Sequence, residues 1–155
     1  MYFVDRKNME ETVCYIEHLN DVYAQAGATD SPLAKLALER IVQGWIEAVI
    51  DVGNKMIDGF IMRDPGSYDD IVDILEDEKV IHADDAHSLK NVIALRKPLV
   101  QQYTQINHER IEQVIEDNKK ALEDFPNNIR EYVEKELGPV SAFLPEQDTD
   151  KGKQL

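Results

Sequence analysis

The sequence predicts an all-α protein, an up-and-down helical bundle with one long second helix. Three observations support this class. Apolar residues recur at spacings of three and four along most of the chain, and no stretch alternates as a strand would. Ser, Asn, Pro and Gly stand where helices would begin or end. The length of 155 residues is that of one domain with one hydrophobic core.

The N-terminal part predicts two helices. An apolar stripe at helical spacing runs through residues 5–26. The second helix begins after Ser31, which can cap it, and Pro32 takes the first helical position, where a missing N–H costs nothing. It continues to about Met62, which gives about 30 residues and ~45 Å at 1.5 Å per residue. A helix of that length favours a bundle or a dimer.

The middle of the chain predicts two shorter segments of helix. Ser67 lies in the turn RDPGSYDD and can cap a helix that reaches about Lys79. The next helix begins near Asp84 and continues into LRKPLVQQY, residues 95–103. The chain therefore reaches a proline while its helical pattern is still running.

The C-terminal part predicts two helices and a tail. Asn107 is expected to cap a helix that Pro126 interrupts or kinks, and a separate last helix, NNIREYVEKEL, ends at Gly138. Residues 1–140 are therefore assigned to one helical domain. The remaining residues, 141–155, are polar with few apolar anchors, and we expect them to be disordered.

The formal net charge is −14, from 17 Lys and Arg and 31 Asp and Glu residues. Such a surface repels nucleic acid and anionic membranes on average, so any nucleic-acid role needs a local basic site. Cys14 is the single cysteine, which excludes a disulfide within one chain and favours a reduced, cytoplasmic setting. No apolar run approaches the ~18 residues of a membrane span, so no membrane partner is expected.

One face of the long helix is polar. It carries five residues at spacings of seven, four, three and four: Arg40, Glu47, Asp51, Asn54 and Asp58. The opposite face is apolar: Ile41, Trp45, Ala48, Val52 and Ile61. The polar stripe is either a solvated face or the wall of a cleft between helices or protomers. Gly44, Gly53 and Gly59 cost up to ~1 kcal/mol each in a helix and indicate close approach of neighbouring helices.

Histidine and carboxylate side chains lie together in the segment HADDAHSLK. They are His82, Asp84, Asp85 and His87. Such residues can bind a metal, but this spacing matches no strong metal signature, and acidic residues at a helix start are already favoured by the helix dipole. We therefore expect no metal and no cofactor. His18 and His108 are isolated, and we expect them at the surface or at helix caps.

The segment LRKPLVQQY places polar side chains around a proline. Arg96 and Tyr103 are seven residues apart and would share a helix face, whereas Gln101 would lie about 140° around the axis from Arg96. Pro98 disrupts a regular helix. The segment is either a structural helix end or a site that a kink or a second protomer completes. Three apolar residues are expected to hold it on the core: Leu95, Leu99 and Val100.

The segment RKPLVQQY resembles the R-x4-H-x-Y signature of the HepT-like branch of HEPN helical domains. The long second helix, ALERIVQGWIEAVIDVGNKMIDGF, and the loop DPGSYDDI add to the resemblance, which covers roughly residues 3–137 and is greatest to YutE-type members. It implies an all-α homodimer whose two signature segments face each other across a cleft. It also implies an RNA-cleaving toxin and a small nucleotidyltransferase antitoxin that attaches AMP to the signature tyrosine.

The signature is incomplete in this sequence. By position, Arg96 matches the arginine and Tyr103 the tyrosine, while Gln101 takes the place of the histidine. Histidine moves protons near neutral pH because its pKa is about 6.5, and a glutamine amide cannot. Lys97 also departs from the small polar residue usual after the arginine.

Two main hypotheses follow from the resemblance. In the first, the chain is a metal-independent endoribonuclease toxin, weak or inactive because of Gln101. Arg96 would then hold a phosphate, Gln101 would position it, and Tyr103 would accept AMP or contact RNA. In the second, the chain is a noncatalytic homodimer that binds a nucleotide, RNA or a protein in the same cleft. A structural dimer without a ligand is a third possibility.

Overall fold

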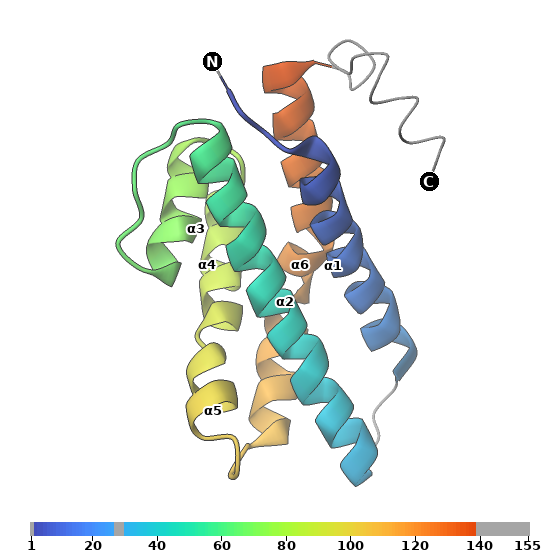
Figure 1. The fold of residues 1–155 in the computed structure, drawn as a ribbon. Helices are drawn as coiled ribbons and strands as arrows, with labels where there is room; N and C mark the ends of the chain where they lie inside the picture. The colour runs from blue at the N-terminus through green and yellow to red at the C-terminus, as the bar shows by residue number, and fades with distance from the viewer. Residues whose placement is uncertain (1, 27–29, 139–155) are drawn as a thin grey trace.

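The computed structural model describes residues 2–26 and 30–138, which contain six helices and no strand (Figure 1). The helices are α1 (Arg6–Ala26), α2 (Pro32–Gly59), α3 (Tyr68–Asp77), α4 (Ala83–Ile93), α5 (Arg96–Gln101) and α6 (His108–Leu137). Along the long axis α1 runs opposite to α2, and α4 with α5 runs opposite to α6 (Figure 1). The predicted all-α bundle is confirmed, whereas the predicted disorder of residues 141–155 lies outside the described residues.

Three predicted caps are present. The side-chain oxygens of Ser31, Ser67 and Asn107 each accept a hydrogen bond from the backbone N–H three residues later, at 3.1, 3.0 and 3.1 Å. Each bond satisfies one of the N–H groups that the first turn of a helix leaves without an intrahelical partner. The starts of α2, α3 and α6 were therefore readable from local sequence.

The end of α2 differs from the prediction. The helix has 28 residues and stops at Gly59, before the predicted end near Met62. Ile61 takes a φ of 57°, a left-handed conformation that interrupts the helical path. Its side chain is consequently exposed, so its assignment to the apolar face of α2 was wrong. The other four residues of that predicted face, Ile41, Trp45, Ala48 and Val52, are buried.

The helix that was expected to continue into LRKPLVQQY is divided in two, so the expected kink or helix end near Pro98 lies just before the proline. Helix α4 ends at Ile93, a turn follows at residues 94–95, and α5 begins at Arg96. Pro98 thereby lies in the first turn of a new helix, where its backbone nitrogen needs no intrahelical acceptor. The break precedes the proline for this reason.

Helix α6 continues through Pro126, so the separate last helix that we predicted does not exist. A proline deprives the carbonyl four residues earlier, that of Leu122, of its intrahelical N–H partner. The Asn20 side chain of α1 replaces it, since its Nδ2 donates to this carbonyl at 3.1 Å. Asn20 Oδ1 in turn accepts a hydrogen bond from Trp45 Nε1 at 2.9 Å. Asn20 thus connects α1 to both α2 and α6.

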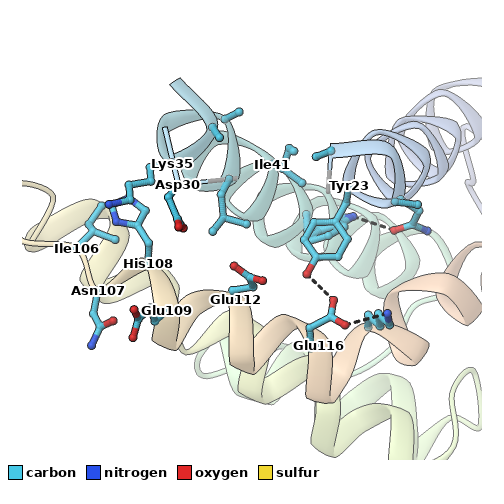
Figure 2. Close-up of a pocket in the computed structure, with 18 of the residues that line it drawn as sticks. Tyr23, Asp30, Lys35, Ile41, Ile106, Asn107, His108, Glu109, Glu112 and Glu116 are labelled. Atoms are coloured by element: carbon cyan, nitrogen blue, oxygen red, sulfur yellow. Dashed lines mark hydrogen bonds and ion pairs between the residues drawn. The ribbon is translucent and has the colours of Figure 1, made fainter. Parts of the chain in front are cut away.

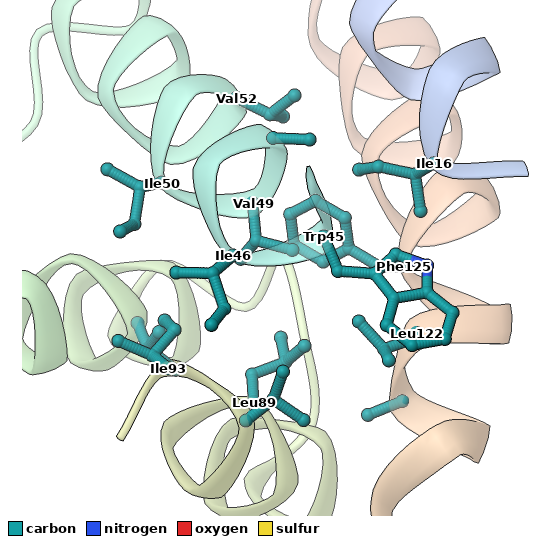
Figure 3. Close-up of a cluster of buried hydrophobic side chains, with 14 of the residues drawn as sticks. Ile16, Trp45, Ile46, Val49, Ile50, Val52, Leu89, Ile93, Leu122 and Phe125 are labelled. Atoms are coloured by element: carbon teal, nitrogen blue, oxygen red, sulfur yellow. The ribbon is translucent and has the colours of Figure 1, made fainter. Parts of the chain in front are cut away.

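The core lies around the central part of α2. Trp45, Ile46 and Val49 point between the neighbouring helices, toward Leu89 of α4 and Phe125 of α6 (Figure 3). All five side chains are buried. Because the apolar side of α2 is covered by α1, α4 and α6, its polar stripe is left on the outside.

No described helix is long and apolar enough to cross a membrane.

The glycines of α2 allow neighbouring segments to approach closely, as predicted. A Cβ atom built on Gly53 would lie 2.4 Å from Cγ2 of Ile71 in α3. We expect Gly53→Ala to lower the free energy of unfolding by ~1–2 kcal/mol, because overpacking outweighs the ~1 kcal/mol gain in helix propensity. Urea unfolding measures the change. Gly66→Ala, whose Cβ would meet nothing nearer than 3.7 Å, is the matched control, and an unchanged Gly53→Ala midpoint would contradict the packing argument.

Candidate functional site

Helix α5 carries the segment that resembles the signature. Leu95 and Leu99 are buried and hold it against the core, whereas Val100 is exposed, contrary to our expectation for that residue. Arg96 is the first residue of the helix and Gln101 the last. The core contacts therefore fix the direction of α5 and leave its polar residues at the surface.

Arg96 contacts two other helices. Its Nε donates a hydrogen bond to Glu47 Oε1 of α2 at 3.0 Å. Its guanidinium carbon lies 5.0 Å from the ring centroid of Tyr68, the first residue of α3. Within the described residues, neither terminal nitrogen of Arg96 makes a hydrogen bond. The side chain is thus held at one nitrogen and on one ring face, and among residues 2–26 and 30–138 its Nη1–Nη2 edge has no hydrogen-bond partner.

A second cluster orders the loop before Tyr68. Arg63 donates two hydrogen bonds to the Asp70 carboxylate, each 2.9 Å long, and the backbone N–H of Gly66 donates to the same group at 2.8 Å. The Arg63 guanidinium and, secondly, the Gly66 N–H lower the pKa of Asp70. These contacts close the loop DPGSYDD onto the start of α3. Tyr68 is consequently attached to an ordered turn beside Arg96.

The three predicted site residues lie on different parts of α5 and the turn after it. Residues 96–101 form a regular helix, which leaves Gln101 about 140° around the axis from Arg96. The chain departs from helical geometry at Gln102 (φ −117°, ψ 37°), and Tyr103 beyond it is 68% exposed. Within the described residues, no hydrogen bond joins any two of Arg96, Gln101 and Tyr103. Their grouping into one site stays a prediction.

The polar stripe of α2 is exposed along its length. Four of its five residues, all but Asp58, also line a shallow groove of about 410 Å³ together with Thr12 and Tyr15 of α1. The stripe is therefore both a solvated face and, in part, the wall of a groove between α1 and α2. Glu47 is the residue that belongs to this groove and also contacts Arg96.

A larger groove of about 880 Å³ lies between α1, α2 and α6 (Figure 2). The Tyr23 hydroxyl donates to Glu116 Oε2 at 2.6 Å, and burial, followed by this carboxylate, raises the pKa of Tyr23 above its ordinary range. His108 follows the cap residue Asn107 and lies in the wall of the groove, partly exposed, with its Nε2 2.7 Å from Glu39 Oε2. Glu112 points into the same space (Figure 2). So many carboxylates make this groove unsuitable for a phosphate.

The histidines and carboxylates at the start of α4 do not gather into a cluster in the described part of the chain. Among residues 2–26 and 30–138, no three His, Cys, Asp or Glu side chains lie close enough together to hold a metal ion. Asp85 Oδ2 instead accepts a hydrogen bond from Asn128 Nδ2 at 3.4 Å. His18 is exposed on α1, as expected of an isolated surface histidine.

A family model described as "Ribonuclease HepT-like" matches residues 9–129. The chain belongs to the HepT-like family. The Bacillus subtilis protein named "Putative RNase YutE" is 51% identical to it over 143 residues, which are 92% of this chain and 99% of YutE.

Two solved structures support the family fold. That of YutE, described as a cytosolic protein of unknown function, has a TM-score of 0.85 and covers 92% of this HepT-like chain and 100% of its own. That of a tri-AMPylated Shewanella oneidensis HEPN toxin in complex with an MNT antitoxin has a TM-score of 0.65 at 22% identity. It covers 79% of this chain and 94% of the toxin chain, and at this identity it shows the fold alone.

Sequence reasoning missed two residues of this region. Glu47 was recognised as a member of the polar stripe, and Tyr68 only as part of the loop DPGSYDDI. Neither was connected to Arg96, because Glu47 lies 49 residues and Tyr68 28 residues (96 − 68) from it in the chain, and such contacts leave no trace in local periodicity. The loop DPGSYDDI is part of the family resemblance, and this was the signal that could have drawn attention to Tyr68.

Proposed function

We propose that this HepT-like protein binds RNA through Arg96 and cleaves it weakly or not at all. The observation that carries the proposal is a guanidinium that α2 and α3 hold in place and whose Nη1–Nη2 edge has no hydrogen-bond partner in the part of the chain that the structure describes. A guanidinium binds phosphate through two parallel N–H groups, and such charge-assisted bonds are about twice as strong as neutral ones. Arg96 therefore suits a phosphodiester even though the protein as a whole is acidic.

Gln101 is the reason for weak or absent chemistry. Cleavage through a 2′-hydroxyl needs a group that accepts and returns a proton, which typically contributes 10²–10⁴-fold to the rate. A glutamine amide can orient a phosphate but cannot take up a proton near neutral pH. His108 is no replacement, because its ring is paired with Glu39 in the carboxylate-lined groove. No metal is required in this scheme.

The alternative is a noncatalytic module that binds a nucleotide, RNA or a protein in the same place. The net charge of −14 and the amide at position 101 both favour it over an efficient nuclease. The two candidates share the role of Arg96 and differ in whether any RNA is cut. A direct cleavage assay therefore separates them.

We further propose that the working unit is a homodimer. Arg96 and Gln101 point in different directions from α5, so a second copy offers a way to bring one protomer's arginine toward the other's amide and phenol. The outward side of α2 also begins with two leucines, Leu33 and Leu36, which are 78% and 61% exposed. Apolar side chains of this size favour contact with another protein surface. Sedimentation equilibrium tests this, and a monomer at micromolar concentration would contradict it.

A nucleotidyltransferase partner is the second proposed contact. Tyr103 is the candidate acceptor of AMP, since its phenol is exposed beyond the end of α5 and open to a modifying enzyme. The AMPylated state of the Shewanella toxin supports this by analogy of fold. A cytoplasmic location is proposed as well, in keeping with the description of YutE as cytosolic.

Arg96→Ala is expected to weaken RNA binding about 10- to 100-fold, which corresponds to the ~1.5–3 kcal/mol of a charge-assisted hydrogen bond. Fluorescence anisotropy with a labelled single-stranded RNA, at fixed salt, measures the affinity. In the same samples with EDTA, the wild type should cut the RNA slowly or leave it intact.

The matched control is Lys97→Ala, which removes the same charge from the adjacent exposed position. It should weaken binding by less than Arg96→Ala does. If the two variants lost RNA affinity equally, the contribution of Arg96 would be that of any nearby positive charge and not of a specific contact. Rapid cleavage by the wild type that depends on Arg96 would contradict the role assigned to Gln101.

A further inference from the structure

We propose that Glu47 and Tyr68 are positioning residues that fix the Arg96 guanidinium for end-on, bidentate contact with a phosphate. This inference rests on the proposed function, because it concerns the same arginine. It adds two residues from α2 and α3 that nothing in the signature segment specifies. It also states the direction from which the anion arrives, toward the Nη1–Nη2 edge.

Glu47 holds the arginine by its inner nitrogen. The carboxylate accepts from Nε at 3.0 Å, and within the described residues it bonds neither terminal nitrogen. An arginine side chain loses about 2 kcal/mol of rotamer entropy when it is fixed. A guanidinium that is already held by Nε meets part of this cost before the anion binds. The arrangement therefore favours phosphate binding even though the carboxylate brings a negative charge close to the site.

Tyr68 restrains the guanidinium plane. The Arg96 carbon lies 5.0 Å from the ring centroid, within the ~6 Å of a cation–π contact. The ring covers one side of the guanidinium and contributes no hydrogen-bond acceptor to it. Since one side is covered and Nε is engaged, the remaining outward direction for bonding is the Nη1–Nη2 edge.

The ordered loop explains how Tyr68 reaches this position. Ser67 caps α3 immediately before Tyr68, and Asp70 fixes the loop through Arg63 and the Gly66 N–H. Arg63, Gly66, Ser67 and Asp70 make no hydrogen bond with Arg96 in the described part of the chain, so their contribution is to set the start of α3 and the place of Tyr68. The loop, α2 and the signature segment all belong to the family resemblance. Arg96 of the signature segment contacts one residue of each of the other two.

Two variants of Glu47 separate positioning from charge. Both Glu47→Gln and Glu47→Ala remove the negative charge, but only glutamine retains an acceptor for Arg96 Nε. We expect the Gln variant to bind inorganic phosphate at least ~3-fold more tightly than the Ala variant, because positioning survives in one and not in the other. The affinity is read from the ¹⁵Nε–H signal of Arg96 during a phosphate titration, after the signal is assigned by its loss in Arg96→Lys.

The Tyr68 pair tests the ring in the same way. Tyr68→Phe keeps the aromatic face and should leave phosphate affinity within twofold of the wild type. Tyr68→Leu removes the face and should weaken phosphate affinity at least ~3-fold.

Asp51→Asn is the control for charge on α2, because Asp51 pairs with Lys55 and not with Arg96. It should change phosphate affinity by less than twofold, and thermal unfolding checks that each variant is folded.

The outcomes distinguish this inference from the proposed function. Equal phosphate affinities for Glu47→Gln and Glu47→Ala, or an Arg96 signal that does not respond to phosphate, would overturn the positioning role. A tighter Ala variant would also overturn it and make Glu47 a competing anion. If the wild type shows the expected phosphate response but binds no RNA, the proposed function fails while the positioning role stands.

Discussion

Gln101→His is expected to raise the rate of RNA cleavage at least ~100-fold over the wild type, since general acid–base help contributes 10²–10⁴-fold. An imidazole at this position can accept the 2′-hydroxyl proton or return one to the leaving oxygen near neutral pH. The exposed end of α5 accepts the larger ring without repacking the core. Single-turnover cleavage of a labelled RNA at pH 7 in EDTA measures the effect.

Two controls make the gain specific. Gln102→His introduces the same side chain at the next exposed position, outside the signature spacing, and should leave the rate within a few-fold of the wild type. Gln101→His combined with Arg96→Ala should lose most of the new activity, because the phosphate is no longer held. Inactivity of Gln101→His in a protein that still binds RNA would show that the glutamine is not the missing element.

The pH profile provides a further check on the same variant. Cleavage by Gln101→His should depend on pH around the ordinary histidine pKa of about 6.5. The residual activity of the wild type should lack that dependence. A new activity with a flat profile would point to a contaminating or metal-dependent nuclease.

The helix starts and the core were accessible to sequence reasoning because they depend on local chemistry. A capping Ser or Asn acts on the next three residues, and apolar periodicity marks the buried face. The error at Pro126 arose where a remote group changes a local preference. Pro126 should end a helix by its own properties, but Asn20 lies 102 residues from the carbonyl that it satisfies. Local patterns contain no information about such a donor.

In the candidate site, too, some features follow from local sequence and others depend on remote contacts. Arg96, Gln101 and Tyr103 were proposed from one short segment, and Arg96 contacts Glu47, which lines an exposed polar groove. Its contacts with Glu47 and Tyr68 depend on the way α2, α3 and α5 meet, which no spacing rule specifies. The break at residues 94–95 has a local cause, since a proline is accommodated best in a first turn. A kink or helix end near Pro98 was expected from the sequence, and the structure places the break just before the proline.

The link made by Asn20 is expected to be the most costly polar contact to remove from the bundle. Asn20→Ala leaves the indole N–H of Trp45 and the carbonyl of Leu122 without partners, and both residues are buried. Each unsatisfied group costs ~1–3 kcal/mol, so we expect a loss of ~2–4 kcal/mol in the free energy of unfolding. Urea unfolding followed by Trp45 fluorescence measures it.

A double-mutant cycle with Pro126→Ala tests the cause. An alanine at position 126 restores a backbone N–H that can donate to Leu122, so Asn20→Ala should cost at least ~1 kcal/mol less in that background. Asn54→Ala, at an exposed position on α2, should show no such coupling to Pro126→Ala. Strict additivity of Asn20→Ala and Pro126→Ala would mean that Asn20 does not compensate for the proline. The continuity of α6 would then need another explanation, because no other hydrogen bond to the Leu122 carbonyl comes from a side chain of the described residues.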